Sequence, residues 1–355
     1  MTLPPKATQG TVPLPFVAPH PTAPYATDKP AHDAYGRRID YLRVSLTDRC
    51  NLRCVYCVPT PGLPHAPHAT LLTNDELLLV VRAAAAAGFR KLRLTGGEPT
   101  LRHGLVELIR ALKTIPGIEQ IAMTTNALRL PKLAEPLKAA GLDRVNISID
   151  SLDPVKFHQI SRGGSLAEVW AGVHAAAAAG LHPLKLNAVI VRGMNDAEVV
   201  QLAALTLEHP WEFRFIEVMP LRGVAGLAEE GVVSSAELLA RLAAHFGTLE
   251  PCGQKRADPA RCYRLPGAQG KLGFISAVTD PFCATCNRMR LTADGRLHLC
   301  LLRDHEVDLR AAIRNGATHA EVEQLIRYAV QLKPWGHGLP EGVRPQVRGM
   351  AELGG

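Results

Sequence analysis

Cysteine spacing is the feature of this sequence that most directly suggests chemistry, because six of its eight cysteines form two triplets. A structural zinc ion is held by four ligands and an ordinary iron–sulfur cluster by four cysteines. A triplet therefore predicts a cluster with one iron left open to bind something else. The first triplet is Cys50, Cys54 and Cys57, and the second is Cys283, Cys286 and Cys300.

Zinc is the alternative use of the first triplet, with His65 or His68 as the fourth ligand. The spacing lacks the paired two-residue knuckles that are usual for structural zinc, which favours a cluster. The two remaining cysteines, Cys252 and Cys262, lie in a turn-rich stretch, and we interpret them as ordinary thiols.

Length and composition indicate one large α/β body with an appendage, since 355 residues with 47% hydrophobic side chains can bury a full core. No apolar run approaches the ~20 residues of a membrane span, and the N-terminus does not resemble a signal peptide. We therefore expect a cytoplasmic protein, whose thiols stay reduced and are available to metal. The formal charge of +7 fits a nucleic-acid partner, a solvated basic surface or a polyanion site.

A repeated strand–helix rhythm predicts the fold. Residues 1–35 contain eight prolines and predict a disordered tail. Six strand–helix units follow in 36–246, and 247–355 forms a C-terminal region. The expected strands are 41–46, 90–95, 119–125, 144–149, 184–191 and 212–218. The expected helices are 73–88, 102–115, 131–140, 153–180, 196–208 and 234–246.

Alternation along these strands favours an incomplete, open (βα)6 TIM-like barrel over a doubly wound sheet, whose strands would be hydrophobic on both faces. In the first, second, fourth and fifth strands one face is apolar, and the opposite faces carry Arg43, Lys91, Arg93, Asp150 and Lys185. If the apolar faces meet the helices, these cations line the interior and suit a polyphosphate. The alternative is that the polar faces meet water, as in an antiparallel meander.

A glycine pair follows the second expected strand, in Gly96-Gly97-Glu98-Pro99. Two residues without Cβ allow backbone groups to approach a ligand. Together with Cys50-x3-Cys54-x-Tyr56-Cys57, this run resembles the radical S-adenosylmethionine superfamily. The resemblance implies a four-iron four-sulfur cluster whose open iron chelates S-adenosylmethionine, and whose electron cleaves it to a 5′-deoxyadenosyl radical.

The second triplet lies in a predicted hairpin, since Asp294-Gly295 stands between alternating segments and would return Cys300 beside Cys283 and Cys286. This stretch, with the run 215–220 and the terminal Gly354-Gly355, resembles the GTP 3′,8-cyclase family of molybdenum-cofactor biosynthesis from about Tyr35 onward. The C-terminal extension is therefore expected to carry a second four-iron cluster whose open iron binds guanine.

The resemblance also assigns positions to both ligands. Tyr56, Gly97, Ser148 and Met219 correspond to S-adenosylmethionine positions. The GTP positions are Arg43, Lys91, Arg93, Thr124, Lys185, Arg214, Arg288 and Arg290. The tail residues Gly354 and Gly355 are expected to enter the active site near Arg288 and Arg290.

The implied reaction converts GTP to (8S)-3′,8-cyclo-7,8-dihydroguanosine 5′-triphosphate. The 5′-deoxyadenosyl radical abstracts the ribose H3′, and the C3′ radical adds to guanine C8. The implied partners are an external electron donor and cyclic pyranopterin monophosphate synthase, the next enzyme; no membrane or nucleic acid is expected, and the sequence leaves a homodimer open.

Two other function classes stay open at this point. A radical enzyme with an auxiliary cluster, such as a peptide maturase, would have no need of Arg288, Arg290 and the inward cations. A zinc or cluster protein that binds nucleic acid would place basic residues and aromatics on an outer face. Aromatic residues make up only 5% of this chain, which disfavours that class.

Overall fold

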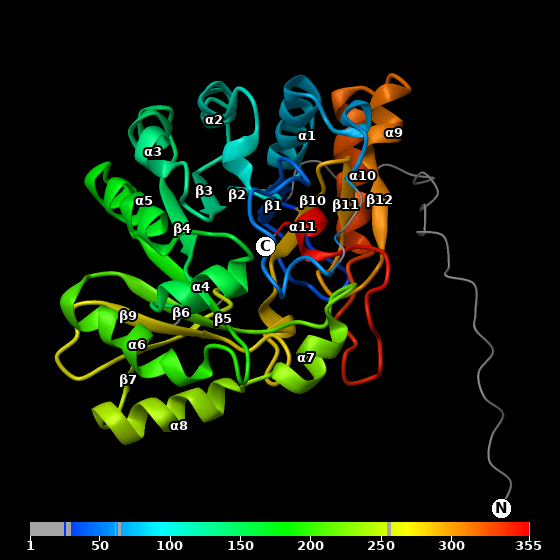
Figure 1. The fold of residues 1–355 in the computed structure, drawn as a ribbon. Coiled ribbons are helices and arrows are strands. Elements are labelled where there is room, and N and C mark those ends of the chain that lie inside the picture. Colours follow the sequence, from blue (N-terminus) through cyan, green and yellow to red (C-terminus); the bar gives the residue numbers. More distant parts are fainter. Residues whose placement is uncertain (1–24, 26–29, 61, 63–64, 254–256, 355) are drawn as a thin grey trace, which may run out of the picture.

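Six strand–helix units follow one another in the computed structural model, which describes residues 25, 30–60, 62, 65–253 and 257–354 (Figure 1). Most of the predicted disordered tail and Gly355 lie outside the described residues. The strands are β1 (Tyr41–Ser45), β2 (Lys91–Thr95), β3 (Gln120–Thr125), β4 (Arg144–Ser148), β5 (Lys185–Ile190) and β6 (Glu212–Glu217). The helices after them are α1 (Asn74–Ala86), α2 (Leu105–Lys113), α3 (Leu130–Ala139), α4 (Pro154–Ser161), α5 (Leu166–Ala178), α6 (Val199–Glu208), α7 (Ala225–Gly231) and α8 (Ser235–Phe246).

All strands belong to one sheet, in the order β12-β11-β10-β1-β2-β3-β4-β5-β6-β9-β8-β7. Strands β1 to β6 are parallel to their neighbours, and β10 (Arg288–Leu291) and β9 (Lys271–Ile275) add parallel strands at either side. Antiparallel edges complete it, with β11 (Arg296–His298) and β12 (Glu306–Asp308) at one side and β8 (Arg261–Arg264) and β7 (Glu250–Pro251) at the other. Within the described residues β12 and β7 are not paired, so the predicted partial barrel is confirmed as open.

Two details differ from the sequence prediction. The single helix expected over 153–180 is wrong, because the chain turns between α4 and α5, where Arg162 adopts a φ of +51°. Two glycines, at positions 163 and 164, follow it and favour this break. The short helix α7 was not predicted, and of the strands in 247–355 only the β10–β11 hairpin was.

Helix ends and core follow the sequence closely. Thr73 and Glu76 form the capping box of α1, with Thr73 Oγ1 accepting from the Glu76 N–H at 3.2 Å. Gly88 and Gly141 follow helices at φ values of +104° and +105°, which favour glycine. The apolar face of the strands forms the core under the helices, with Leu92 and Leu186 fully buried.

The C-terminal region covers the β1 side of the sheet. Helices α9 (Leu309–Arg314) and α10 (His319–Gln331) follow β12, and α10 packs against α1. The predicted hairpin is confirmed between β10 and β11, with Gly295 at a φ of +80°. Figure 1 shows the chain ending beside the short helix α11 (Met350–Leu353), over the middle of the sheet. No helix in the described part of the chain is long and apolar enough to cross a bilayer.

Candidate active site

A cavity of about 730 Å³ lies on the polar face of the sheet. Ten Lys or Arg residues and four Asp or Glu residues line it, an excess of positive charge that suits an anionic ligand. The inward-facing alternation predicted from the sequence is therefore confirmed. Of the predicted ligand residues, those that line it are Arg43, Tyr56, Lys91, Arg93, Thr124, Ser148, Lys185, Arg214, Met219, Arg288 and Arg290, with the second triplet.

Arg93 is fixed by the strands on both sides of β2. Its Nε donates to the Tyr41 hydroxyl at 2.6 Å, and its Nη1 donates to Thr124 Oγ1 at 3.2 Å. Burial raises the pKa of Tyr41, but the charges of Arg93, Arg43 and Arg144 outweigh it and lower the pKa to about 8. The sequence did not single out Tyr41 or Arg144, which both line the cavity.

Two acidic residues that the sequence reasoning missed organise the β6 side of the cavity. Glu212 accepts from Lys185 Nζ at 2.5 Å and from Arg214 Nε, and Asp258 lies 3.3 Å from Arg214 Nη2. Burial, followed by the Arg214 charge, lowers the pKa of Lys185 to about 8. Alternation could have placed Glu212 beside Arg214, two residues along the same strand face.

The first triplet lies in a loop that packs on the glycine pair. The Gly97 N–H donates to Thr47 O at 2.7 Å, and the Glu98 N–H donates to Arg49 O at 2.8 Å. A Cβ on Gly96 would collide with the Thr47 backbone, and one on Gly97 with the Arg49 backbone. The close approach that requires these glycines is therefore made by the cysteine loop itself, and Gly97 lies beneath this loop.

Glu98 ties this loop to the end of β3. Its fully buried carboxylate accepts from Thr125 Oγ1 at 2.7 Å and from the Asn126 N–H at 2.8 Å. The Asn126 side-chain Nδ2 in turn donates a long hydrogen bond to Cys50 Sγ, at 4.0 Å. A donor to a ligating sulfur is a common outer-shell contact of a metal site.

The three thiols of the first triplet influence one another electrostatically. Burial raises the pKa of Cys50 to about 11 and that of Cys57 to about 12. The pKa of Cys54 is raised by burial, by Asp150 and by the other two thiols. These thiols therefore keep their protons unless a metal displaces them, which fits a donor set for metal.

A single-ion site is a different arrangement. Among the described residues, no group of three or more His, Cys, Asp or Glu side chains could hold one metal ion. A cluster instead binds each thiolate to a separate iron. Of the histidines considered as zinc ligands, His65 lies with its Nδ1 3.7 Å from Asp48 Oδ2, and His68 begins the short helix η1 (His68–Thr70).

A carboxylate lies between the first triplet and the cavity. Asp150 Oδ2 accepts from the Tyr56 hydroxyl at 2.6 Å, and Oδ1 accepts from the Val189 N–H at 2.8 Å. Burial raises the pKa of Asp150 to about 6, against the effect of both hydrogen bonds. The sequence placed Asp150 on the inner face of the barrel but gave it no role.

The second triplet is assembled by the β10–β11 hairpin and the helix η4 (Cys283–Thr285), and all three thiols line the cavity. Burial raises the pKa of Cys283. Burial acts the same way on Cys286, but the charges of Lys333 and Arg288 outweigh it and lower its pKa. Arg37 fixes the loop by donating from Nη1 to Cys283 O at 2.7 Å.

The two arginines of β10 have different partners. Arg288 Nη2 donates to Ala257 O at 2.5 Å, while its buried Nη1 has no hydrogen-bond partner among the described residues. Arg290 Nη1 donates to Leu353 O at 3.3 Å and to Gly354 O. Gly354 has a φ of +78°, and a Cβ there would collide with Thr95, so this position beside Arg290 requires glycine.

Further buried polar atoms along the cavity lack partners within the described part of the chain. They are Asn187 Oδ1, Asn287 Oδ1, His337 Nε2 and His298 Nε2, all on residues of the cavity wall, whereas His298 Nδ1 lies 3.7 Å from Glu306 Oε2. Buried polar atoms are normally paired, so this set indicates a wall built for a polar ligand. His298 was not identified from the sequence, which offered no signal beyond its place on a strand.

The cysteines outside the triplets lie opposite each other at the β7–β8 edge of the sheet. The Cys252 N–H donates to Cys262 O at 2.8 Å, and both side chains are free thiols. Cys262 contributes to the cavity wall.

Comparisons with known proteins place these features in a family. Residues 44–206 match the model of the Radical SAM superfamily, and residues 211–339 match that of Molybdenum Cofactor Synthesis C. The GTP 3′,8-cyclase of Pelotomaculum thermopropionicum is 49% identical over 91% of this chain and 99% of its own. That of Heliobacterium modesticaldum is 46% identical, again over 91% of this chain and 99% of its own.

A solved structure with a similar fold is that of Streptococcus suis SuiB bound to S-adenosylmethionine. It has a TM-score of 0.53 and 15% identity, and the match covers 74% of this chain and 60% of SuiB, less than two thirds of its length. At this identity the likeness concerns the fold alone.

The partial barrel, with three cysteines in the loop after its first strand, defines a radical S-adenosylmethionine enzyme. More closely, the chain belongs to the GTP 3′,8-cyclase family. The resemblance seen in the sequence is thereby confirmed, and the chain is an enzyme of molybdenum-cofactor biosynthesis.

Proposed function

We propose that this enzyme converts GTP to (8S)-3′,8-cyclo-7,8-dihydroguanosine 5′-triphosphate with S-adenosylmethionine as the radical source. The observation that carries the proposal is that one cavity combines three features. They are the cationic wall, the second triplet, and the Tyr56–Asp150 pair that lies beside the first triplet. One shared cavity for both ligands allows hydrogen transfer between them.

The first triplet is the proposed holder of a four-iron cluster that, when bound, supplies the electron for cleaving S-adenosylmethionine to a 5′-deoxyadenosyl radical. The chain's own contribution is to place the ligand. Ser148 and Met219 line the cavity on the side of β4 and β6, and Tyr56 is fixed there by its bond to Asp150. Gly97 would act through its backbone, which lies beneath the cysteine loop.

The second triplet is the proposed holder of a second four-iron cluster, at the base-binding end of the cavity. Its donor set fits, because Cys283, Cys286 and Cys300 are free thiols of one wall and Lys333 and Arg288 favour the thiolate of Cys286. When bound, this group would offer an open iron to guanine.

GTP is proposed to lie along the cationic wall. Lys91 and Lys185 are suited to phosphate oxygens as point charges, and Arg43, Arg93 and Arg214 as planar donors. Thr124, already paired with Arg93, offers a hydroxyl at the same place. Arg288 and Arg290 would flank the nucleotide near the second triplet, with Gly354 beside Arg290.

The radical is proposed to abstract the ribose H3′, after which C3′ adds to guanine C8 and a reduction completes the product. An external electron donor would supply the electrons, and cyclic pyranopterin monophosphate synthase would receive the product. A homodimer and a cytoplasmic location accompany the proposal as expectations.

The test is anaerobic reconstitution followed by reduction and incubation with S-adenosylmethionine and GTP. We expect 5′-deoxyadenosine and the cyclised triphosphate in equal amounts, and about eight irons per chain for two clusters. Deoxyadenosine without nucleotide turnover would count against the cyclase. Stoichiometric zinc in place of iron would refute both clusters.

A further inference from the structure

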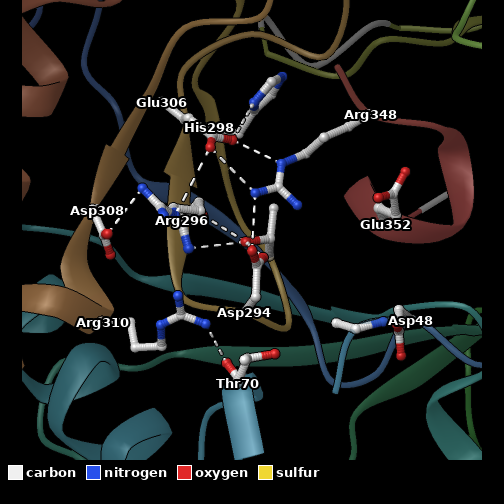
Figure 2. Close-up of polar contacts among 12 residues, drawn as sticks. Asp48, Thr70, Asp294, Arg296, His298, Glu306, Asp308, Arg310, Arg348 and Glu352 are labelled. Atoms are coloured by element: carbon white, nitrogen blue, oxygen red, sulfur yellow. Dashed lines mark hydrogen bonds and ion pairs between the residues drawn. The ribbon is translucent and has the colours of Figure 1, made fainter. Parts of the chain in front are cut away.

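One arginine joins the C-terminal segment to the hairpin of the second triplet (Figure 2). Arg348 Nε donates to Glu306 Oε2 at 2.7 Å, and its Nη2 reaches Glu306 Oε1 at 3.2 Å and Asp294 Oδ2 at 3.0 Å. The side chains of Arg348 and Glu306 are only 12% and 3% exposed. Paired, charge-assisted bonds shielded from water are among the strong polar contacts in proteins, and they also fix orientation.

The two carboxylates belong to the elements that carry the active-site residues. Glu306 lies opposite His298 in the β11–β12 pairing, and His298 lies opposite Arg290 in the β10–β11 pairing. Asp294, in the turn of the same hairpin, accepts from Thr292 Oγ1 at 2.5 Å. The carboxylates are thus fixed by the sheet, in register with Arg290.

A single short helix connects Arg348 to the end of the tail. The Gly349 N–H donates to Glu352 Oε2 at 2.7 Å, and Arg222 Nη2 contacts the same oxygen at 2.7 Å. Leu353 is 1% exposed and packs in an apolar cluster with Leu221. Both ends of helix α11 are therefore held in place. Because only this four-residue helix and Gly349 separate Arg348 from Gly354, fixing Arg348 also restricts where Gly354 lies, in contact with Arg290.

We infer that Arg348 is a positioning residue for the reaction. Held by Glu306 and Asp294, it sets the register of the tail so that Gly354 meets Arg290 at the cavity wall. The inference rests on the proposed function for its catalytic consequence, whereas the anchoring itself can be measured without any ligand.

A nearby arginine provides the matched control. Arg344 lies on the same segment, and its Nη1 donates to the carbonyl oxygens of Leu339 at 3.1 Å and Val343 at 3.0 Å. Replacing Arg344 therefore removes a similar side chain and charge from the tail while leaving the contacts of Arg348 with Glu306 and Asp294 in place.

The first measurement is hydrogen exchange of residues 344–354 in the protein as purified, comparing R348A, R348K and R344A with the wild type. We expect R348A to exchange at least about tenfold faster over this segment, because its local opening becomes easier. R348K should fall between R348A and wild type, since lysine keeps the charge but loses the planar fork. R344A should resemble wild type.

The second measurement is turnover of the reconstituted enzyme. We expect R348A and E306Q to lower the kcat for cyclised nucleotide by about 100-fold through misplacement of the tail. The KM for S-adenosylmethionine should be unchanged, and the ratio of 5′-deoxyadenosine to cyclised nucleotide should rise. A general loss of structure would instead lower iron content and both products together.

Wild-type exchange and wild-type turnover in R348A would overturn the inference. If R348A does not fold, R348K and the milder D294N decide it, because unaltered tail exchange in both would contradict an anchor. A wild-type enzyme that makes no cyclised nucleotide would refute the proposed function instead, and the exchange data would still test the anchor.

Discussion

The two cysteine triplets have opposite electrostatic surroundings, although Tyr56 and Asp150 beside the first triplet and the thiols of the second all line one cavity. Around the first triplet, the carboxylates of Asp150 and Glu98 add to burial in raising thiol pKa values. Around the second, Lys333 and Arg288 lower the pKa of Cys286 in spite of burial. The acidic end suits the sulfonium of S-adenosylmethionine, and the cationic wall suits the triphosphate of GTP, whose base is proposed to face the second triplet.

The triplets also differ in how the chain supports them. The first lies in one loop, held by the neighbouring Gly96-Gly97 turn. The second depends on remote residues, such as Arg37 at Cys283 O and Lys333, which donates to Leu299 O at 2.8 Å. Substitutions should therefore act locally at the first site and spread more widely at the second.

The largest expected effect is a complete loss of S-adenosylmethionine cleavage without a loss of GTP binding. Replacing Cys54 by alanine should reduce 5′-deoxyadenosine formation to background, because a radical precursor requires an intact first site, while GTP binding persists. Product analysis by chromatography and equilibrium dialysis of GTP measure the two. C252A serves as control and should behave as wild type, and retained cleavage in C54A would disprove its role as a ligand.

Changing Cys300 to alanine should have the converse effect. We expect S-adenosylmethionine cleavage to continue and cyclised nucleotide to fall by about 100-fold, because the base is misplaced relative to the radical. GTP affinity should weaken in the same variant. Unaltered GTP binding would show that the second triplet does not position the substrate.

A smaller effect tests the acidic end. D150N removes a negative charge beside the proposed sulfonium site, and we expect about tenfold weaker S-adenosylmethionine binding with unchanged GTP affinity. Because the pKa of Asp150 is raised to about 6, its charge is present above pH 6 and is lost as pH falls through 6. Wild-type affinity should decline below pH 6, whereas that of D150N should not. Titration calorimetry over about one pH unit on either side of the Asp150 pKa measures both affinities. A wild-type affinity that does not change with pH, or a D150N affinity that does, would contradict the prediction.

The smallest effect concerns the pH dependence of GTP binding at the cationic wall. With a pKa of about 8, Lys185 is charged below pH 8 and neutral above it, and Tyr41 gains a negative charge over the same range. GTP binding should weaken as pH rises through 8, by about threefold in total, because each group contributes one charge among the many of the cavity wall. K185R should remove the lysine share and Y41F the tyrosine share. Unchanged pH dependence in the double variant would mean that neither group senses the nucleotide.

Much of this site could be predicted from the sequence because its signals are local. The cysteine spacing marked both triplets, and the two-residue period of strands placed Arg43, Lys91 and Lys185 on the inner face. The helix break at Arg162 and the helix α7 were not predicted, because short elements give weak periodic signals.

The sequence by itself determined the repeated strand–helix units, the polar inner face and the two incomplete cysteine sets. Tertiary structure alone decided which charges meet. It placed β9 and β10 beside β6 and β1, Lys185 against Glu212 of the next strand, and Arg348 against Glu306. The physical reason is that periodicity reports the environment of each residue, whereas an ion pair depends on where two distant segments come together in the folded chain.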